Sequence, residues 1–531
     1  MSRAHALLLA PVLALTACTS GASGDTAEQA PPSASATDEP TAQLARPSGV
    51  QVLGGGASGL ATAASAALYE RSPVVVVAPA GDAAAQARAA AVAVSAGAPL
   101  LLSPEPPDAA AASAAPADDP VEAEVERLGA RTVVAVGEAG AWAEGLEDVE
   151  VVDAPDTAAP AGADPLAAVA GLPLDGPVPE LADGAAPQRQ DGLVVLASAT
   201  APDALAAVAT ARAAGADVHL LGTPDPRASG ELVTALAAEQ PTSVLALGDA
   251  FGDVARLETR LASASTGAQL PAGGQLVLPG KLYVALYGHP GSSALGVLGE
   301  QGVEETIARA KQLAAEYEAA GSGAPVVPTL EIITSVASSA LGDGDYSDES
   351  ELDHVRPLIE AAGREGVYVV LDLQPGYDDF LTQARMYEEL LALPHVGLAL
   401  DPEWRLKPGE RHMRQIGRVS ADEVNSVGTW LADLTRDRKL PQKMLLLHQF
   451  KTFMLEDRDR IDLSRDELSV VTQMDGHGAP RTKLQTWNVL RPGTRDGMRW
   501  GWKNFYDEDT PMLTPAQTLA VEPTPVFVSY Q

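Results

Sequence analysis

Short runs of Val, Leu and Ala alternate along the chain with longer segments whose apolar residues recur at helical spacing. Between Val303 and Ala320, for example, apolar side chains recur with a period near 3.6, as on one face of a helix. Continuous apolar strands that alternate with helices are typical of parallel sheets built from βαβ units. The pattern therefore predicts an α/β fold.

The first half carries this pattern in two copies, and an internal repeat of this kind determines the architecture. In the first copy, a Val-rich strand precedes an Ala-rich helix, and a closing strand ends at Gly137. The second copy opens with a strand from Leu193, and its closing strand ends at Gly248. We expect a module of two parallel βαβ repeats, over residues 48–160 and 161–272.

Three segments of these repeats resemble the type 2 cell-wall-binding repeat. They are the opening Gly56-Ala-Ser-Gly-Leu-Ala-Thr-Ala, the helix start Pro202-Asp-Ala-Leu-Ala, and the closing Leu128-Gly-Ala with Val136-Gly137. The resemblance implies attachment to a polymer of the cell wall. This half is acidic and contains no lysine, so a spacer or a docking platform for another protein stays open as the alternative.

Gly54, Gly56 and Gly59 fit the G-x-G-x-x-G fingerprint of dinucleotide sites. That fingerprint needs an acidic residue about 20 positions later to bind a ribose. The next strand ends in Val77-Ala78-Pro79 and offers no carboxylate. The glycines therefore predict a tight turn between a strand and a helix, and we expect no cofactor.

Eight strand-like runs with helical segments between them follow over residues 273–531. This number and spacing predict a (β/α)8 barrel, also called a TIM barrel, as the C-terminal domain. The runs cover residues 282–287, 326–333, 367–373, 396–401, 443–448, 468–475, 484–490 and 525–530.

Polar residues gather where these runs end. In barrel enzymes the C-terminal ends of the strands meet at one pocket, so we expect a functional site there. The residues expected to bind substrate are His289, Glu331, Asp372, Gln374 and His448, with further carboxylates at Asp401, Glu403 and Asp475.

Asp401 and Glu403 flank one proline at the end of the fourth run. Side chains two apart on a strand share a face, which would place these carboxylates about 6 to 7 Å apart. When two carboxylates lie at such a short distance, the pKa of one of them rises. The protonated group can then donate a proton to a glycosidic oxygen. Aromatic faces suited to sugar rings are available at Trp404, Trp487, Trp502 and Tyr506.

The segment Leu398-Ala-Leu-Asp-Pro-Glu-Trp404 is similar to the fourth strand of chitinase-like and lysozyme-like glycosidase barrels, and Met474-Asp475 resembles their sixth strand. The resemblance implies a retaining glycosidase. In it, Glu403 would be the proton donor, Asp401 its partner, and Asp475 the group that stabilises the sugar cation. The expected substrate is an extracellular or cell-wall glycan.

Two other functions stay open. Imidazole and carboxylate groups suit a divalent metal for hydrolysis, although no His-x-His spacing supports one and we expect no metal. The residues in question are His289, Glu331, Asp372, His448 and Asp475. Alternatively, a barrel without catalysis would bind a glycan or a protein, and Arg405 or Lys503 would then neutralise the pair formed by Asp401 and Glu403.

The first residues read as the signal peptide of a bacterial lipoprotein. The apolar run Ala6–Leu15 is too short to span a bilayer, and Leu15-Thr-Ala-Cys18 resembles a lipobox. The resemblance implies removal of residues 1–17 and a lipid on Cys18, which would anchor the protein at the extracytoplasmic face of the cell membrane. Residues 18–47 are rich in Ala, Ser, Thr and Pro and predict a disordered tether.

The formal net charge of −35 opposes binding to the phosphate backbone of nucleic acid, so we expect no nucleic-acid partner. Cys18 is the only cysteine, which excludes a disulfide framework.

Overall fold

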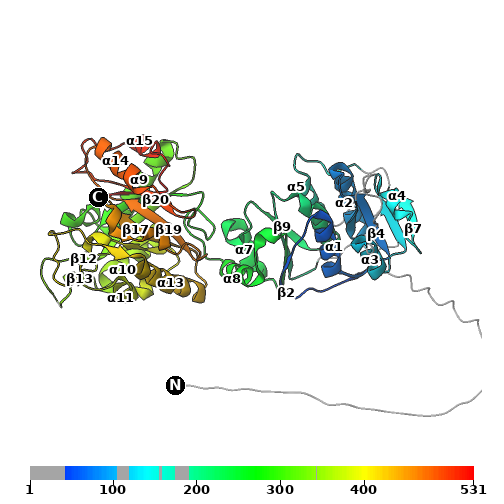
Figure 1. Cartoon of the computed structure of the whole chain (residues 1–531), viewed down its shortest axis with the longest axis horizontal. Helices are drawn as coiled ribbons and strands as arrows, with labels where there is room; N and C mark the ends of the chain where they lie inside the picture. The colour runs from blue at the N-terminus through cyan, green and yellow to red at the C-terminus, as the bar shows by residue number, and fades with distance from the viewer. Residues whose placement is uncertain (1–41, 105–118, 155–157, 174–189, 343) are drawn as a thin grey trace, which may run out of the picture. The chain divides into compact units, whose positions relative to one another are not determined.

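The structure, a computed structural model, describes residues 42–104, 119–154, 158–173, 190–342 and 344–531 (Figure 1). It contains two four-stranded parallel sheets, followed by a closed barrel of eight parallel strands. The predicted fold class is therefore confirmed. The predicted signal peptide and Cys18 lie outside the described residues. Within the described ranges, no helix combines the length and the apolar character needed to cross a membrane.

One sheet of the N-terminal half follows the expected βαβ pattern. Its elements are β4 (Val74–Pro79), α2 (Ala83–Ala96), β5 (Leu100–Ser103), α3 (Pro120–Leu128), β6 (Thr132–Ala135), α4 (Ala139–Ala143) and β7 (Glu150–Asp153). The strand order is β5-β4-β6-β7. Helix α2 begins after Asp82, whose side chain accepts hydrogen bonds from two backbone N–H groups, and it ends at Gly97 with a φ of 61°.

The other sheet has the order β2-β10-β8-β9. A short antiparallel pair, β1 (Gln43–Leu44) with β3 (Tyr69–Arg71), lies beside the helices. The remaining elements are β2 (Gly49–Leu53), α1 (Ala57–Leu68), α5 (Pro165–Ala170), β8 (Leu193–Ser198), α6 (Leu205–Ala213), β9 (Asp217–Leu221), α7 (Gly230–Glu239), β10 (Ser243–Leu247) and α8 (Val254–Ala264).

Strand β2 does not join the sheet that follows it in sequence. It belongs to the expected first repeat, residues 48–160, yet it pairs in parallel with β10, from Gly49 opposite Ser243 to Leu53 opposite Leu247. The expected boundary after residue 160 therefore does not separate the two sheets, because the N-terminal strand completes the second one. A local pattern predicts a strand but not its partner.

The barrel closes because β11 pairs with both β12 and β21. Its strands are β11 (Leu282–Gly288), β12 (Val326–Ala337), β14 (Tyr368–Leu373), β15 (Val396–Leu400), β17 (Lys443–Gln449), β19 (Leu468–Met474), β20 (Arg499–Asn504) and β21 (Phe527–Tyr530). Strand β13 (Ser347–Glu349) extends β12 as a hairpin, and β16 (Val419–Ser420) pairs with β18 (Leu455–Glu456). The helices are α9 (Val303–Ala319), α10 (Leu352–Arg364), α11 (Phe380–Met386), α12 (Glu388–Leu391), α13 (Ala421–Asp437), α14 (Pro480–Leu490) and α15 (Pro515–Leu519).

The seventh strand lies elsewhere than predicted. Residues 484–490 were expected to form it, but they belong to α14, and β20 takes that place in the barrel. Pro480 stands in the first turn of α14, where a proline is tolerated. Lys483, Trp487 and Leu490 are buried at spacings of four and three residues, which is the helical period.

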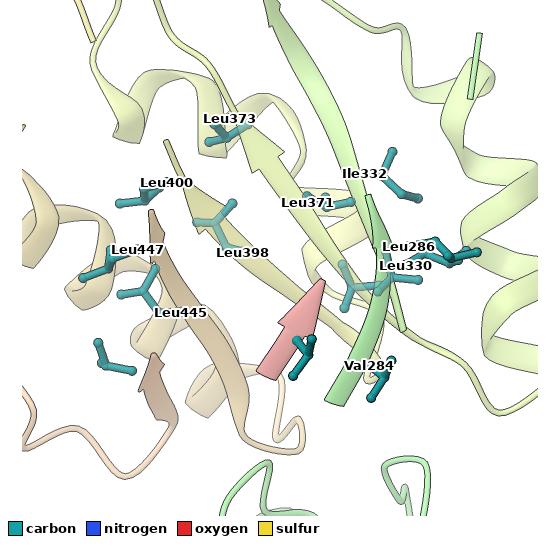
Figure 2. Close-up of a cluster of buried hydrophobic side chains, with 14 of the residues drawn as sticks. Val284, Leu286, Leu330, Ile332, Leu371, Leu373, Leu398, Leu400, Leu445 and Leu447 are labelled. Atoms are coloured by element: carbon teal, nitrogen blue, oxygen red, sulfur yellow. The ribbon is translucent and has the colours of Figure 1, made fainter. Parts of the chain in front are cut away.

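Alternate residues of the barrel strands face opposite sides. One set forms a core with the surrounding helices, and Figure 2 shows members of it projecting from the strands, among them Leu371, Leu398 and Leu445. The other set forms a separate core inside the barrel, which includes Tyr368, Ala399 and Leu446. This alternation determines which polar residues at the strand ends face the interior.

Candidate active site

The inward-facing positions at the C-terminal ends of the strands carry polar side chains instead of apolar ones. Each stands an even number of residues after an inner-core residue of its own strand, as Asp372 does after Tyr368 and His448 after Leu446. The structure brings the strand-end residues of this set together in one buried cluster. The cluster consists of Tyr287, Glu331, Asp372, Asp401, His448 and Asp475.

His448 lies at the centre of this cluster and is fully buried. Its Nδ1 lies 2.9 Å from Oδ2 of Asp475, and its Nε2 lies 2.8 Å from Oε1 of Glu331. Oδ1 of Asp372 lies 3.7 Å from the same Nε2. Burial lowers the pKa of His448, but the charges of Asp372 and Glu331 and the hydrogen bonds outweigh it and raise this pKa well above its usual value. Both ring nitrogens therefore donate to carboxylates, and the imidazole is a buried cation.

Asp372 is also held from the other side. The hydroxyl of Tyr287 donates to its Oδ2 at 2.9 Å, and the amide of Gln374 donates to that same hydroxyl at 3.3 Å. Burial, the largest cause, raises the pKa of Asp372 to about 6, while the charge of His448 opposes the rise. Among the described residues, Oδ1 of Asp372, Oε2 of Glu331 and Oδ1 of Asp475 accept no hydrogen bond. Several carboxyls this close around one cation cannot all be ionised.

Asp401 and Glu403 reach the site differently from the sequence-based expectation. Strand β15 ends at Leu400, and Asp401 caps the short 3-10 helix Pro402–Trp404 by accepting a hydrogen bond from the N–H of Glu403 at 3.1 Å. The two carboxylates therefore do not alternate along one strand, so that geometry was wrong. Proline after Asp401 favours the turn, because its ring presets the first helical φ.

The pKa of Glu403 is raised to about 7, first by burial and then by the charge of Asp475, while Lys503 and His448 lower it. The pKa of Asp401 is raised well above its usual value, again mainly by burial, with His448 opposing. Within the described part of the chain, no Arg or Lys nitrogen lies within 4.0 Å of the Glu403 carboxylate. Arg405, one expected neutralising partner, instead pairs with Glu423 at 3.0 Å.

A pocket of about 520 Å³ opens above this cluster. Asp401, Glu403 and Asp475, the three residues expected to be catalytic, all line it, as do Gln374 and Trp404. Glu331, Asp372 and His448 do not line it, but His448 is hydrogen-bonded to Asp475 and Asp372 to Tyr287, and both of these partners do. The pocket is therefore a concave site lined by the carboxyl groups of Asp401, Glu403 and Asp475 and by the aromatic side chains of Trp404, Phe450 and Phe505.

The other aromatic residues expected to bind sugar lie away from this pocket. Trp502 is fully buried and faces outward from β20, where its ring packs edge to face against Trp487 of α14, with centroids 5.6 Å apart. The prediction that Trp502 binds substrate was wrong because β20 was not expected to be a strand, so the sequence did not show which of its side chains face outward. Tyr506 is 40% exposed and does not line the pocket; Arg309 covers its ring at 5.6 Å.

His289 does not reach this pocket either. Its Nε2 lies 3.0 Å from the hydroxyl of Ser350, and its Nδ1 accepts a hydrogen bond from the N–H of Gly291. It lines a separate hollow of about 270 Å³ together with His354. His289 stands just beyond the end of β11, in a turn in which the N–H of Ser292 donates a hydrogen bond to the His289 carbonyl at 3.1 Å.

Asp401, His448 and Asp475 each present one potential metal ligand, and these atoms lie within 4.8 Å of one another. A metal ligand needs a free lone pair on the imidazole, because only the neutral ring coordinates. Both nitrogens of His448 instead lie at hydrogen-bond distance from carboxylates. The cluster fits a protonated imidazole better than a metal.

Two further residues of the site were not among those expected from sequence to be catalytic or to bind substrate. Tyr287, at the end of β11, positions Asp372, and its place among the polar strand ends was a usable signal. Lys503, in β20, lines the pocket with its Nζ 3.4 Å from the centre of the Tyr287 ring. Successive side chains of a strand face opposite sides, so Lys503 faces inward because its neighbour Trp502 faces outward. This direction can be inferred only once β20 is known to be a strand.

Comparisons with known proteins add little to this geometry. No protein-family model and no curated protein matches the sequence. Among solved structures, Cwp6 from Clostridium difficile aligns over 66% of this chain and 66% of its own, with 14% identity and a TM-score of 0.31. A structure described as a cellulase–inhibitor complex aligns over 46% of this chain and 83% of its own, with 11% identity and a TM-score of 0.28. This chain thus spans just under two thirds of Cwp6, and scores this low support no functional argument.

Proposed function

We propose that the barrel is a glycoside hydrolase that acts on an extracellular or cell-wall glycan. The observation that carries the proposal is the Glu403 carboxyl. It lines the pocket, has no basic ion-pair partner among the described residues, and has a pKa raised to about 7, so it holds a proton near neutral pH. A protonated carboxyl beside a second carboxylate, Asp475, is the arrangement that glycosidic bond cleavage requires.

The reaction follows from these positions. Glu403 gives its proton to the glycosidic oxygen, which takes the electron pair of the breaking C–O bond and leaves as an alcohol. The positive charge that develops on the sugar is stabilised by the carboxylate of Asp475, which His448 holds in place through Nδ1. Water then adds to the sugar carbon, and its proton returns to Glu403. Asp401 positions Glu403 by capping the turn on which it stands.

The position of Trp404 favours a sugar as the ligand of the pocket. Its half-buried indole lines the pocket next to Glu403, and the imidazole of His412 packs edge to face against it with centroids 5.3 Å apart. A braced aromatic ring next to the proton donor offers the apolar face on which a sugar ring stacks.

Release of reducing ends from purified wall glycans tests the hydrolase directly. The chain from residue 18 with Cys18→Ser is expected to release them, and the same chain with Glu403→Gln is not. Glu423→Gln is a matched control, because Glu423 is a barrel carboxylate paired with Arg405 and should leave catalysis intact. Glycan binding without release by the unsubstituted chain would instead support a barrel that binds without catalysis.

The cellular setting is a second part of the proposal. A lipid on Cys18 would hold the protein at the extracytoplasmic face of the membrane, and the two parallel sheets would contact a wall polymer or serve as a spacer. Labelling of cells with a radioactive fatty acid should mark the protein, and Cys18→Ala should abolish the label. Binding of the soluble chain to isolated walls, with and without competing wall polymer, separates attachment from spacing.

A further inference from the structure

Lys503 differs from the other fully buried lysines of the barrel. Lys443 is buried, and its Nζ donates hydrogen bonds to the carbonyls of Leu393 and Val396 at 2.9 and 2.8 Å. Lys483 is 2% exposed, and its Nζ pairs with the carboxylate of Asp509. Each therefore has the acceptors that a buried ammonium group needs.

Lys503 is only 3% exposed, yet its ammonium group has no such acceptor. Within the described ranges, no carboxylate oxygen lies within 4.0 Å of its Nζ and no oxygen accepts a hydrogen bond from it. Its neighbours are aromatic faces, with Nζ 3.4 Å from the centre of the Tyr287 ring and 5.3 Å from that of Phe505. The rings hold the cation by cation–π attraction but leave its N–H donors unused.

These donors belong to a residue that lines the pocket of Glu403. We propose that Lys503 binds a carboxylate carried by the glycan, so that the preferred substrate is an acidic sugar. The inference rests on the proposed function, because it takes the pocket to be a glycan site. Lys451 and His477, which follow the ends of β17 and β19, line the same pocket.

A carboxylate fits this site better than a phosphate. A single ammonium group balances one negative charge, whereas a phosphate dianion favours several donors or the fork of an arginine. Among the residues that the structure describes, no arginine lines the pocket. The carboxyls that line the pocket oppose a single negative charge less than their number implies, because burial raises the pKa of Glu403 to about 7 and that of Asp401 well above its usual value.

The net charge of −35 makes this local cation necessary. At long range the protein repels an acidic glycan, so selection of one requires a positive group at the point of contact. A lysine that only balanced the nearby carboxylates would make no distinction between acidic and neutral sugars. The two roles therefore differ in a measurable property, the ratio of the affinities for matched acidic and neutral ligands.

The test measures binding to the full chain with Glu403→Gln, so that hydrolysis does not interfere. The probes are a muramic-acid disaccharide from peptidoglycan and a glucuronic-acid oligosaccharide, each beside its carboxyl-reduced counterpart. By calorimetry we expect at least one acidic probe to bind ten-fold or more tightly than its reduced counterpart. This comparison needs no substitution at Lys503, so it holds even if that variant folds poorly.

Adding Lys503→Met should weaken binding of the preferred acidic probe only, so that its affinity comes within about two-fold of that of its reduced counterpart. Lys503→Arg should retain part of the preference for the acidic probe. Lys311→Met, which removes an exposed lysine paired with Glu365 on the outside of the barrel, should leave the ratio unchanged. Equal binding of both members of every pair, absence of binding, or equal weakening of both by Lys503→Met would overturn the inference. Acid-selective binding without hydrolysis by the unsubstituted chain would overturn the proposed function alone.

Discussion

The raised pKa of Glu403 predicts that removing its charge stabilises the protein while it destroys activity. A carboxyl whose folded-state pKa lies above its unfolded value destabilises the fold once it ionises. Its unfavourable contribution is absent below pH 4.5, grows as the pH rises to about 7, and is complete above that. Glutamine keeps the shape of the side chain and removes the ionisation. Glu403→Gln should therefore be more stable than the wild type at pH 8, and the difference should vanish near pH 4.5.

The magnitude follows from the shift. A pKa raised from 4.5 to about 7 corresponds to ~3 kcal/mol, at about 1.4 kcal/mol for each pH unit. This is an upper bound, because Glu403 is half-buried and its neighbours titrate with it. A gain of about 1 to 3 kcal/mol in the free energy of unfolding at pH 8 is expected.

Urea unfolding followed by tryptophan fluorescence measures this gain. Five of the six tryptophans lie in the barrel, so the signal reports mainly on the domain that contains Glu403. Glu423→Gln is the control and should have the opposite sign at pH 8, since it weakens the ion pair with Arg405. Equal stability of wild type and Glu403→Gln at both pH values would refute the reasoning, because Glu403 would then not hold its proton.

Four further outcomes are expected. The rate of hydrolysis should fall as the pH rises through about 7, because Glu403 loses its proton, and a pH–rate profile shows this. His448→Gln should lower kcat at least 100-fold, with a smaller effect on KM, and should reduce the free energy of unfolding by ~3 kcal/mol, because it removes a buried cation between carboxylates. Steady-state kinetics measures the first effect and urea unfolding the second. Dialysis against EDTA should leave activity unchanged; loss of activity that zinc or manganese restores would contradict the assignment of His448 as a cation. Trp404→Ala should weaken glycan binding about ten-fold, whereas Trp487→Phe should lower stability and leave affinity unchanged, as calorimetry and unfolding would show.

Much of the fold follows from the sequence because parallel strands buried on both faces read as continuous apolar runs. Seven of the eight barrel strands lie where such runs were found. Residues 484–490 were predicted to be a strand because four apolar side chains in seven residues are compatible with both a strand and a helix period. Strand β20 was hidden because its inner positions, Gly501 and Lys503, are not apolar.

The sequence predicts where the candidate site lies but not how its side chains contact one another. Strand ends converge in any such barrel, so Glu331, Asp372 and His448 were found without knowledge of their contacts. The hydrogen bonds of His448 join three different strands, and no spacing within the sequence encodes them. Glu403 was predicted to belong to the site because it was expected to lie on the strand. It lies instead in the short 3-10 helix that begins at Pro402.

The pairing of β2 with β10 also determines how the protein bears mechanical load. Tension that enters before Gly49 and leaves toward the barrel after Leu247 pulls two adjacent parallel strands from opposite ends, which loads their hydrogen bonds in shear. Five consecutive residue pairs share that load at once, so they must break together. The chain between the two strands, including the whole β5-β4-β6-β7 sheet, lies outside the path of the force as long as this pairing holds. A pull on the barrel would therefore leave that sheet folded until β2 separates from β10.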